Sequence, residues 1–208
     1  MAFKMTASSG GDFTPAPAGN HLGVCTRVID RGTHQPPFPD ARPRREVAIS
    51  WEIDERMEDG RPFLCTAYLN LSMNEKATLR HWLEAWRGRA FGESEDFNIA
   101  NILGKSCLVT VTHTDQGKAK VAGIGALPKG MQPMAAKGEL MAFDLDDPDW
   151  RIFDQLHERT QQEISSSPEY ARARNAGRPQ ASAAQQHPAP ADYDAGEGGD
   201  PFEEDISF

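Results

Sequence analysis

Hydrophobic residues alternate with small or polar residues along three stretches in the first third of the chain. In residues 22–28 and 46–53 every second residue is apolar or Thr, a period of two that is typical of β-strands. After the turn at residues 58–61, a third stretch, 63–71, predicts a strand that forms a hairpin with the second. The first strand is expected to end at Gly32, where a turn leads into a Pro-rich loop.

The period then changes from two to that of a helix. Apolar residues between Ala77 and Trp86 fall on one helical stripe, with Asn74 as the predicted N-cap and Gly88 as the helix stop. Trp51, Trp82 and Trp86 are expected in the core because each lies on an apolar stripe.

Two further strands are predicted at residues 106–113 and 119–127, around the turn at 115–117. The order β-β-β-α-β-β is that of a five-stranded OB-fold barrel, so the fold class is mainly β. A last amphipathic helix, at about residues 150–164, is expected to pack outside the barrel.

Composition divides the chain into four parts. We expect a flexible N-terminal segment at 1–19 and a folded OB domain at 20–168, including the last helix. Residues 169–199 are rich in Ala, Gln, Pro and Gly and predict a disordered linker. Residues 200–208 form an acidic tip.

The net charge of −9 argues at first against a nucleic-acid partner, because phosphate binding depends on Lys and Arg. The distribution changes that picture. All seven acidic residues of the segment 171–208 lie in its last seventeen positions, which hold no Lys or Arg. The acidity is therefore concentrated in a tail that is separate from the predicted barrel.

Several classes of protein are disfavoured. There is no apolar run of membrane-spanning length and no signal-peptide pattern at the start, so we expect a cytoplasmic protein with no membrane partner. Three widely spaced cysteines predict buried free thiols rather than a zinc site or disulfides. The histidines show no metal-binding spacing, and the acidic run 144–149 fits the turn before a helix better than a calcium loop. We expect no catalytic residue, metal or cofactor.

Basic and aromatic residues in the loops favour a binding function. Single-stranded nucleic acid needs cations along its phosphates and flat rings beneath its bases, and in an OB barrel it lies across strands two and three between two loops. Tyr68 is the predicted stacking residue on strand three, with Thr66 and Asn70 exposed beside it. The predicted DNA-binding residues are Arg31, Phe38, Arg42, Arg44, Arg45, Tyr68, Lys118, Lys120, Arg87 and Arg89.

The C-terminal tip places aromatic and aliphatic side chains amid acids, a pattern that favours a partner with an apolar pocket rimmed by cations. It resembles the tip of bacterial single-stranded-DNA-binding proteins, an acidic run followed by Ile-Pro-Phe, although Ser207 stands where that family has Pro. By this match, Asp205, Ile206 and Phe208 are the predicted partner-binding residues.

The body, from Pro17 to Tyr170 and including Trp86-Arg-Gly-Arg89, resembles phage and prophage single-stranded-DNA-binding proteins of the OB type. The resemblance implies a non-enzymatic protein, in a bacterial host cell if phage-encoded, that coats single-stranded DNA during replication, recombination or repair. Its tip would recruit replication and recombination proteins, and a homo-oligomer is possible. The alternatives are a protein-interaction hub or DNA-mimic inhibitor that uses the acidic tail, and a nuclease that uses the run 144–149.

Overall fold

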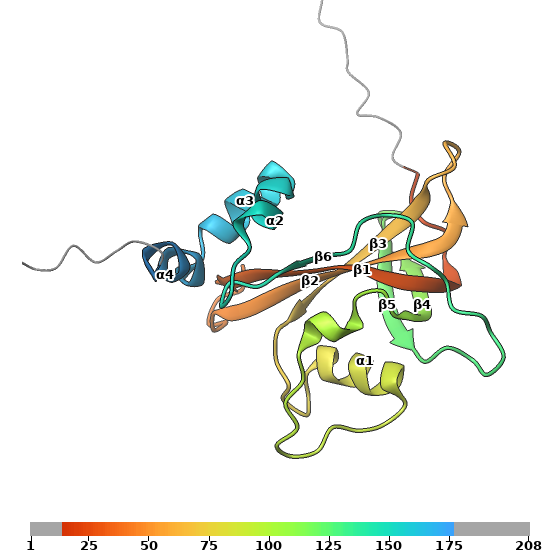
Figure 1. Ribbon diagram of the computed structural model, residues 1–208, viewed down its shortest axis with the longest axis horizontal. Helices are drawn as coiled ribbons and strands as arrows, with labels where there is room; N and C mark the ends of the chain where they lie inside the picture. Colours follow the sequence, from red (N-terminus) through yellow and green to blue (C-terminus); the bar gives the residue numbers. More distant parts are fainter. Residues whose placement is uncertain (1–13, 177–208) are drawn as a thin grey trace, which may run out of the picture. The chain divides into compact units, whose positions relative to one another are not determined.

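The computed structural model describes residues 14–176 (Figure 1). Five long strands and a small sixth strand form one sheet, and the helices lie between and after them. In chain order the elements are β1 (Gly19–His34), β2 (Arg44–Arg56), β3 (Pro62–Asn70), α1 (Thr78–Arg87), the 3-10 helix η1 (Ile99–Ile102), β4 (Ser106–His113), β5 (Ala119–Gly125), β6 (Met141–Phe143), α2 (Trp150–Gln155), α3 (Glu158–Ser165) and α4 (Pro168–Ala176).

The strands follow the order β3-β2-β1-β4-β5, with antiparallel neighbours, while β6 pairs in parallel with β1. The predicted sequence of five strands with one helix after the third is confirmed. The three-residue β6 was not predicted, because Met141 and Phe143 around the exposed Ala142 give too short a pattern to distinguish.

The closed five-stranded barrel is not formed. Strands β3 and β5 approach each other, but no hydrogen-bonded ladder joins them within residues 14–176. Thr14 and Ala16 of the N-terminal segment line a pocket at this seam together with side chains of both strands. His113 hydrogen-bonds the Ala16 carbonyl at 2.8 Å, which holds the segment beside the seam. The sheet is therefore open between its first and last strands in the pairing order.

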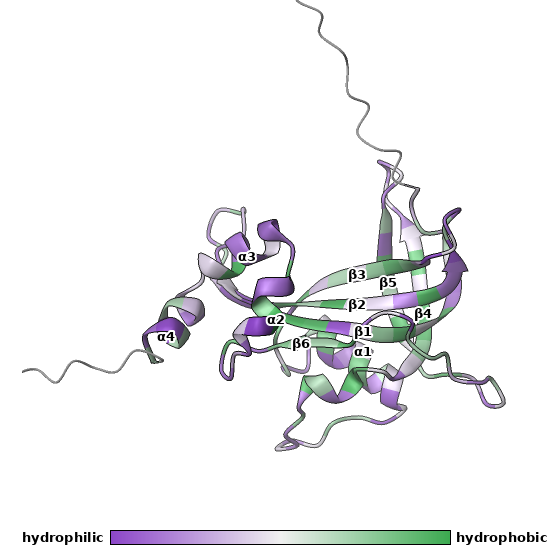
Figure 2. Ribbon diagram, turned by 45° about the horizontal axis from the view of Figure 1, so that its top comes forward, coloured by the Kyte–Doolittle hydropathy of each residue, from purple (hydrophilic) through white to green (hydrophobic). Residues whose placement is uncertain are grey.

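The main core lies on the sheet face that carries Val47, Ile49, Trp51 and Ile53, all of them buried. Figure 2 shows hydrophobic stretches along β1 and β2, interrupted by polar ones. Helix α1 covers this face with the buried Leu79 and Leu83. The indole rings of Trp82 and Trp86 each lie 6.4 Å from that of Trp51, so the three tryptophans belong to the core as predicted.

Helix α1 begins later than Asn74, the predicted N-cap. The N-cap position is Ala77, whereas the Asn74 side chain accepts a hydrogen bond from the Lys76 amide at 3.0 Å in the turn before the helix. Asn and Asp side chains often stabilise such turns instead of capping a helix. The predicted stop is confirmed, because Gly88 adopts the left-handed conformation that ends the helix.

Strand β1 does not end at Gly32, where the sequence predicted a turn. It runs to His34 with bulges at two places, between Cys25 and Arg27 and between Asp30 and Gly32. Gly32 has a φ of +79°, and its N–H donates to the Asp30 carboxylate at 2.9 Å. A Cβ at this position would lie 2.3 Å from Ser167, so glycine permits the close approach of the C-terminal segment.

The last helix, expected at about residues 150–164, is two short helices, α2 and α3, and a third, α4, follows them. The chain leaves helical geometry at Leu156 and His157, and the third helix begins at Pro168. They pack on the opposite face of β1 and β2 around a second core. This core contains Ile29, Ala48, Met141, Phe143, Leu145, Phe153 and Ile164.

The folded part also continues beyond the boundary expected at residue 168. Helix α4 reaches Ala176, and the buried Glu169 at its start accepts hydrogen bonds of 2.8 Å from both the amide and the hydroxyl of Thr33. Residues 169–176 therefore do not form a linker.

Candidate nucleic-acid interface

The sheet has a second face, which points away from the main core and which we call the outer face. Two regions of it differ in what covers them. The helices α2–α4 lie over one part, next to Ile29 and Ala48, and we call this the covered half. The other part, the open half, consists of Arg27, Leu64, Thr66 and Tyr68, with Lys118 and Lys120 alongside.

Tyr68 has the ring that best suits stacking in the open half. Its side chain is on β3 and the residue is 64% exposed, next to the half-buried Thr66. The Arg31 guanidinium lies 4.7 Å from the ring centroid. One ring face therefore has a cationic neighbour, and the high exposure leaves room for a base to stack. The predicted exposure of Tyr68 and Asn70 is confirmed, whereas Thr66, also expected to be exposed, is half-buried.

Three hollows meet at Leu64, an exposed leucine on β3. One lies toward α2 and α3, one lies toward the β2–β3 turn, and the third is the pocket at the seam between β3 and β5. Their volumes are about 210, 510 and 550 Å³. Together they form a hollowed path across the open half, with an apolar side chain at its centre.

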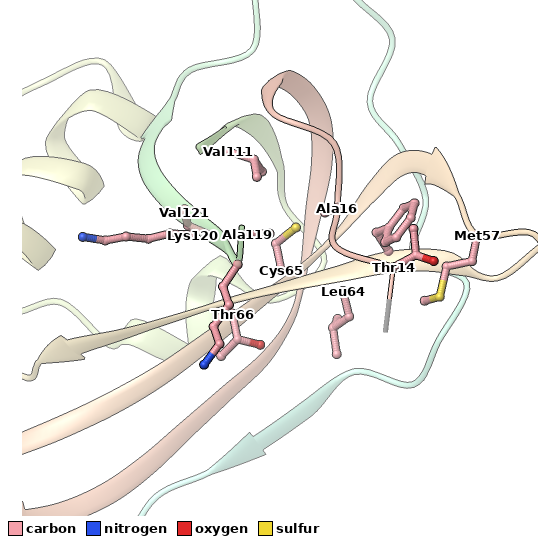
Figure 3. A pocket seen from close by; sticks show the side chains of 12 residues that line it. Thr14, Ala16, Met57, Leu64, Cys65, Thr66, Val111, Ala119, Lys120 and Val121 are labelled. Carbon is pink, nitrogen blue, oxygen red and sulfur yellow. The ribbon is translucent and has the colours of Figure 1, made fainter. Parts of the chain in front are cut away.

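Lys118 and Lys120 lie at the seam pocket. Figure 3 shows side chains of β3, including Leu64 and Thr66, and of β5, including Lys120, around this pocket. Neither lysine has a carboxylate within ion-pair distance among residues 14–176. The structure thus brings the predicted β4–β5 turn cations beside the strand that carries Tyr68.

Arg27 was missed by sequence reasoning. It is exposed on β1, lines two of the hollows, and forms no ion pair with any carboxylate in the described part of the chain. The bulge between Cys25 and Arg27 changes the strand's alternation so that Thr26 is buried and Arg27 faces outward. A cation amid apolar strand residues was the available signal, but its direction depends on that bulge.

Arg31 occupies a different environment from the predicted loop position. It lies within β1, is 14% exposed, and forms ion pairs of 2.6 Å with both Glu46 and Glu163. Burial alone would raise the pKa of Glu163, but the hydrogen bonds that it accepts from Arg31 and Arg159 lower it. Arg31 therefore links β1, β2 and α3 beneath the covered half, and its charge is already compensated.

Arg45 is also held in a network of carboxylates. Its guanidinium pairs with the buried Asp30 and with Asp144, and it donates to Asp146 at 2.8 Å. The hydrogen bond to Asp30 is the largest cause of its raised pKa. The expected turn function of the acidic run is confirmed, since Asp149 also accepts from the Arg151 amide at 3.0 Å and caps α2.

The loop between β1 and β2 leaves three predicted residues accessible. Phe38 is 71% exposed, and Arg42 and Arg44 are exposed without an ion pair inside residues 14–176. Because Arg44 lies four residues before Ala48, the partner of Tyr68, it is about 13 Å from that position along β2. The loop is thus a separate candidate contact at the end of the strands.

Arg87 and Arg89 lie away from the outer face. Helix α1 packs on the main core, and both arginines bond Glu95, at 2.5 and 3.2 Å. The Arg87 guanidinium also lies 4.1 Å from the centroid of Phe91. The hydrogen bond from Arg87 is the first cause of the lowered pKa of Glu95. The structure does not bring these two cations together with Tyr68.

The three cysteines are free and buried, as predicted. Burial raises the pKa of Cys25 to about 12 and that of Cys65 to about 11, and it also raises that of Cys107. Among residues 14–176 no group of His, Cys, Asp or Glu side chains is arranged to hold a metal ion. None of the helices described combines the length and apolar character needed to cross a membrane.

The partner-binding prediction for Asp205, Ile206 and Phe208 lies outside the described residues, as do the first thirteen residues and most of the expected linker. Comparison with protein-family models and with curated proteins finds no match. The geometry of the outer face and the sequence are therefore the features that point to a function.

Proposed function

We propose that this chain binds single-stranded DNA across the open half of its outer face. The observation that carries the proposal is the exposed Tyr68 with three cations, Arg27, Lys118 and Lys120, that have no carboxylate partner in the described part of the chain. Stacking on an aromatic ring and charge along the backbone are what sequence-tolerant strand binding requires.

The strand order supports a more specific assignment. An OB-type barrel pairs its strands in the order found here and binds oligonucleotides on the face of strands two and three, where Tyr68 lies. We propose an OB-type sheet whose seam between β3 and β5 is left open and filled by the N-terminal segment.

The contribution of each cation follows from its neighbours. Arg27, Lys118 and Lys120 would contact phosphates beside Tyr68, and Arg42, Arg44 and Phe38 would extend the contact at the β1–β2 loop. Arg31 and Arg45 would act mainly by holding the sheet and the C-terminal helices together, because each is bonded to two or more carboxylates.

The resemblance at the C-terminus extends the proposal to partners. Asp205, Ile206 and Phe208 would recruit enzymes that work on the same DNA in replication, recombination or repair, inside a bacterial cell. Removing Phe208 should abolish this recruitment and leave DNA affinity unchanged; partner binding that persists would refute the role of the tip.

Fluorescence anisotropy with labelled oligo(dT) tests the DNA-binding function. The full chain should bind oligo(dT) at low salt, bind a duplex of equal length more weakly, and release the strand as salt rises. Equal affinity for duplex, or no binding, would contradict the proposal. Cleavage of the oligonucleotide that stops with EDTA would instead reveal a nuclease.

A further inference from the structure

The hollow between the sheet and the C-terminal helices has the size and walls of a site for a single nucleobase. It measures about 210 Å³, below the roughly 300 Å³ at which sites for drug-sized ligands begin. Its sheet wall includes Tyr68 on β3, and its helix wall includes the break between α2 and α3, at Leu156 and His157. A single planar ring fits this volume better than a chain of nucleotides.

The sheet side of the hollow includes the small side chains of Ala48, Ser50 and Thr66 beside the larger Ile29 and Met141. Ala48 is the register partner of Tyr68, and Ser50 is that of Thr66. The Ser50 and Thr66 hydroxyls lie 2.9 Å apart and bond each other. Small residues at these positions leave room in the hollow that Tyr68 also lines, and the two hydroxyls add polar atoms to that lining.

The helix side supplies polar groups that are free to bind. Gln155 and Thr160 line the hollow, and their side chains make no hydrogen bond to another residue between 14 and 176. An amide such as that of Gln155 offers a donor and an acceptor side by side, which matches the edge of a base. In contrast, His157 uses Nδ1 to accept from the Arg159 amide at 3.2 Å.

The two walls are held at a fixed separation. Glu163 of α3 bonds Arg31 of β1 at 2.6 Å, and the fully buried Ile164 anchors the same helix in the second core. The Arg31 guanidinium also lies over the Tyr68 ring. The hollow is thus built by the fold itself and needs no closure to form.

The charge at the hollow distinguishes its mouth from its interior. Arg27 lines the hollow and is exposed without an ion pair in the described chain, whereas the charge of Arg31 is compensated by two glutamates. A phosphate therefore finds one free cation at the rim, beside the space for a base.

We propose that this hollow takes one unpaired base out of the bound strand, stacks it on Tyr68 and contacts its edge with Gln155, while Arg27 holds the adjoining phosphate. This inference rests on the proposed function but adds a distinct claim: one nucleotide position of the bound strand is recognised more strongly than the others, and the C-terminal helices supply part of its recognition.

A scan with abasic oligonucleotides tests the claim. The shortest oligo(dT) that binds the full chain is determined first, and one abasic site is then placed at each position in turn. One position should lower the affinity at least about fivefold, the loss of one stacked base, while the others have smaller effects. Replacing the base there with A, C or G should change affinity, and Gln155→Ala should reduce these differences.

A variant that fills the hollow provides the second arm. Thr160→Trp should flatten the abasic profile, whereas Gln162→Trp, on the same helix but outside the hollow, should preserve it. Circular dichroism tests whether both variants fold. If Thr160→Trp does not fold, the abasic scan of the wild type and the effect of Gln155→Ala decide whether the base site exists. A flat wild-type profile with intact oligo(dT) binding would overturn the base site alone, and absence of oligo(dT) binding would overturn the proposed function as well.

Discussion

The two halves of the outer face use arginine in opposite ways. In the covered half, Arg31 and Arg45 are surrounded by carboxylates and join β1 and β2 to the segments that follow β6. In the open half, Arg27 is exposed with no carboxylate partner in the described chain, next to a hollow and an exposed tyrosine. Arg27 and Arg31 are on the same strand, so their neighbours, and not the strand or the residue type, separate a structural cation from a candidate phosphate contact.

Substitution of the adjacent residues Arg44 and Arg45 should give the largest difference, measured as the free energy of unfolding. Arg45→Ala should lower the free energy of unfolding by about 3 kcal/mol, because it leaves the buried Asp30 without its cation. Arg44→Ala, an exposed position, should change stability by less than about 0.5 kcal/mol. Urea denaturation measures both. Equal effects of the two substitutions would show that the carboxylates around Arg45 add no stability beyond that of an exposed arginine.

Tyr68 tests the open half through DNA affinity. Tyr68→Ala should weaken binding of oligo(dT) by about 1 to 3 kcal/mol, the contribution of one stacked base, while Tyr68→Phe keeps the ring and most of the affinity. Anisotropy titrations measure the change. Unaltered affinity in Tyr68→Ala, with the fold intact by circular dichroism, would mean that the strand lies elsewhere.

Substitution of the cations of the open half should change the salt dependence of DNA binding. Arg27→Ala, Lys118→Ala and Lys120→Ala should each lower the slope of log affinity against log salt by about 0.7, as expected for one lost phosphate contact to a single strand. Arg44→Ala should have a similar effect if the β1–β2 loop also contacts the strand.

Lys76→Ala is the matched control for these slopes. Lys76 is exposed just before α1, the helix that packs on the main core. Its substitution should therefore leave the slope unchanged. A slope that falls equally in this variant would show general electrostatic attraction instead of contacts in the open half.

Lowering the pH should produce the smallest effect, a loss of stability that arises in the covered half. Hydrogen bonds from Thr33 lower the pKa of Glu169 despite the opposing effect of burial. The carboxylate therefore stabilises the fold above its ordinary pKa of 4.5, and this contribution is lost as the pH falls through the lower, folded value. Urea denaturation across this range should show a steeper loss in the wild type than in Glu169→Gln; parallel curves would contradict the contribution of Glu169.

Alternation and the change to a helical period were sufficient to predict the first five strands and the helix that follows the third of them along the chain. They also placed Tyr68 on the exposed side of β3, since a strand of regular period fixes which side each residue faces. Irregular features were not predictable in this way. The bulges at Arg27 and Gly32 are shifts in the pairing of β1 with β2, which the pattern of β1 alone does not contain, and the close approach of Ser167 to Gly32 joins residues far apart in the chain.

The ion pairs of the charged residues could not be predicted either. Sequence reasoning counted Arg31 and Arg45 with the loop cations because they are close to them in the chain. Their carboxylate partners Glu163 and Asp146 lie more than a hundred residues away, so only the folded structure identifies the pairs. Barrel closure was likewise a property of two distant strands and could not be established from their separate patterns.

Binding of oligo(dT) by the full chain, followed by anisotropy at low and then rising salt, tests the central claim most directly. We predict saturable binding that is stronger than for duplex DNA and that weakens steadily with salt. Absence of binding at low salt would contradict the account.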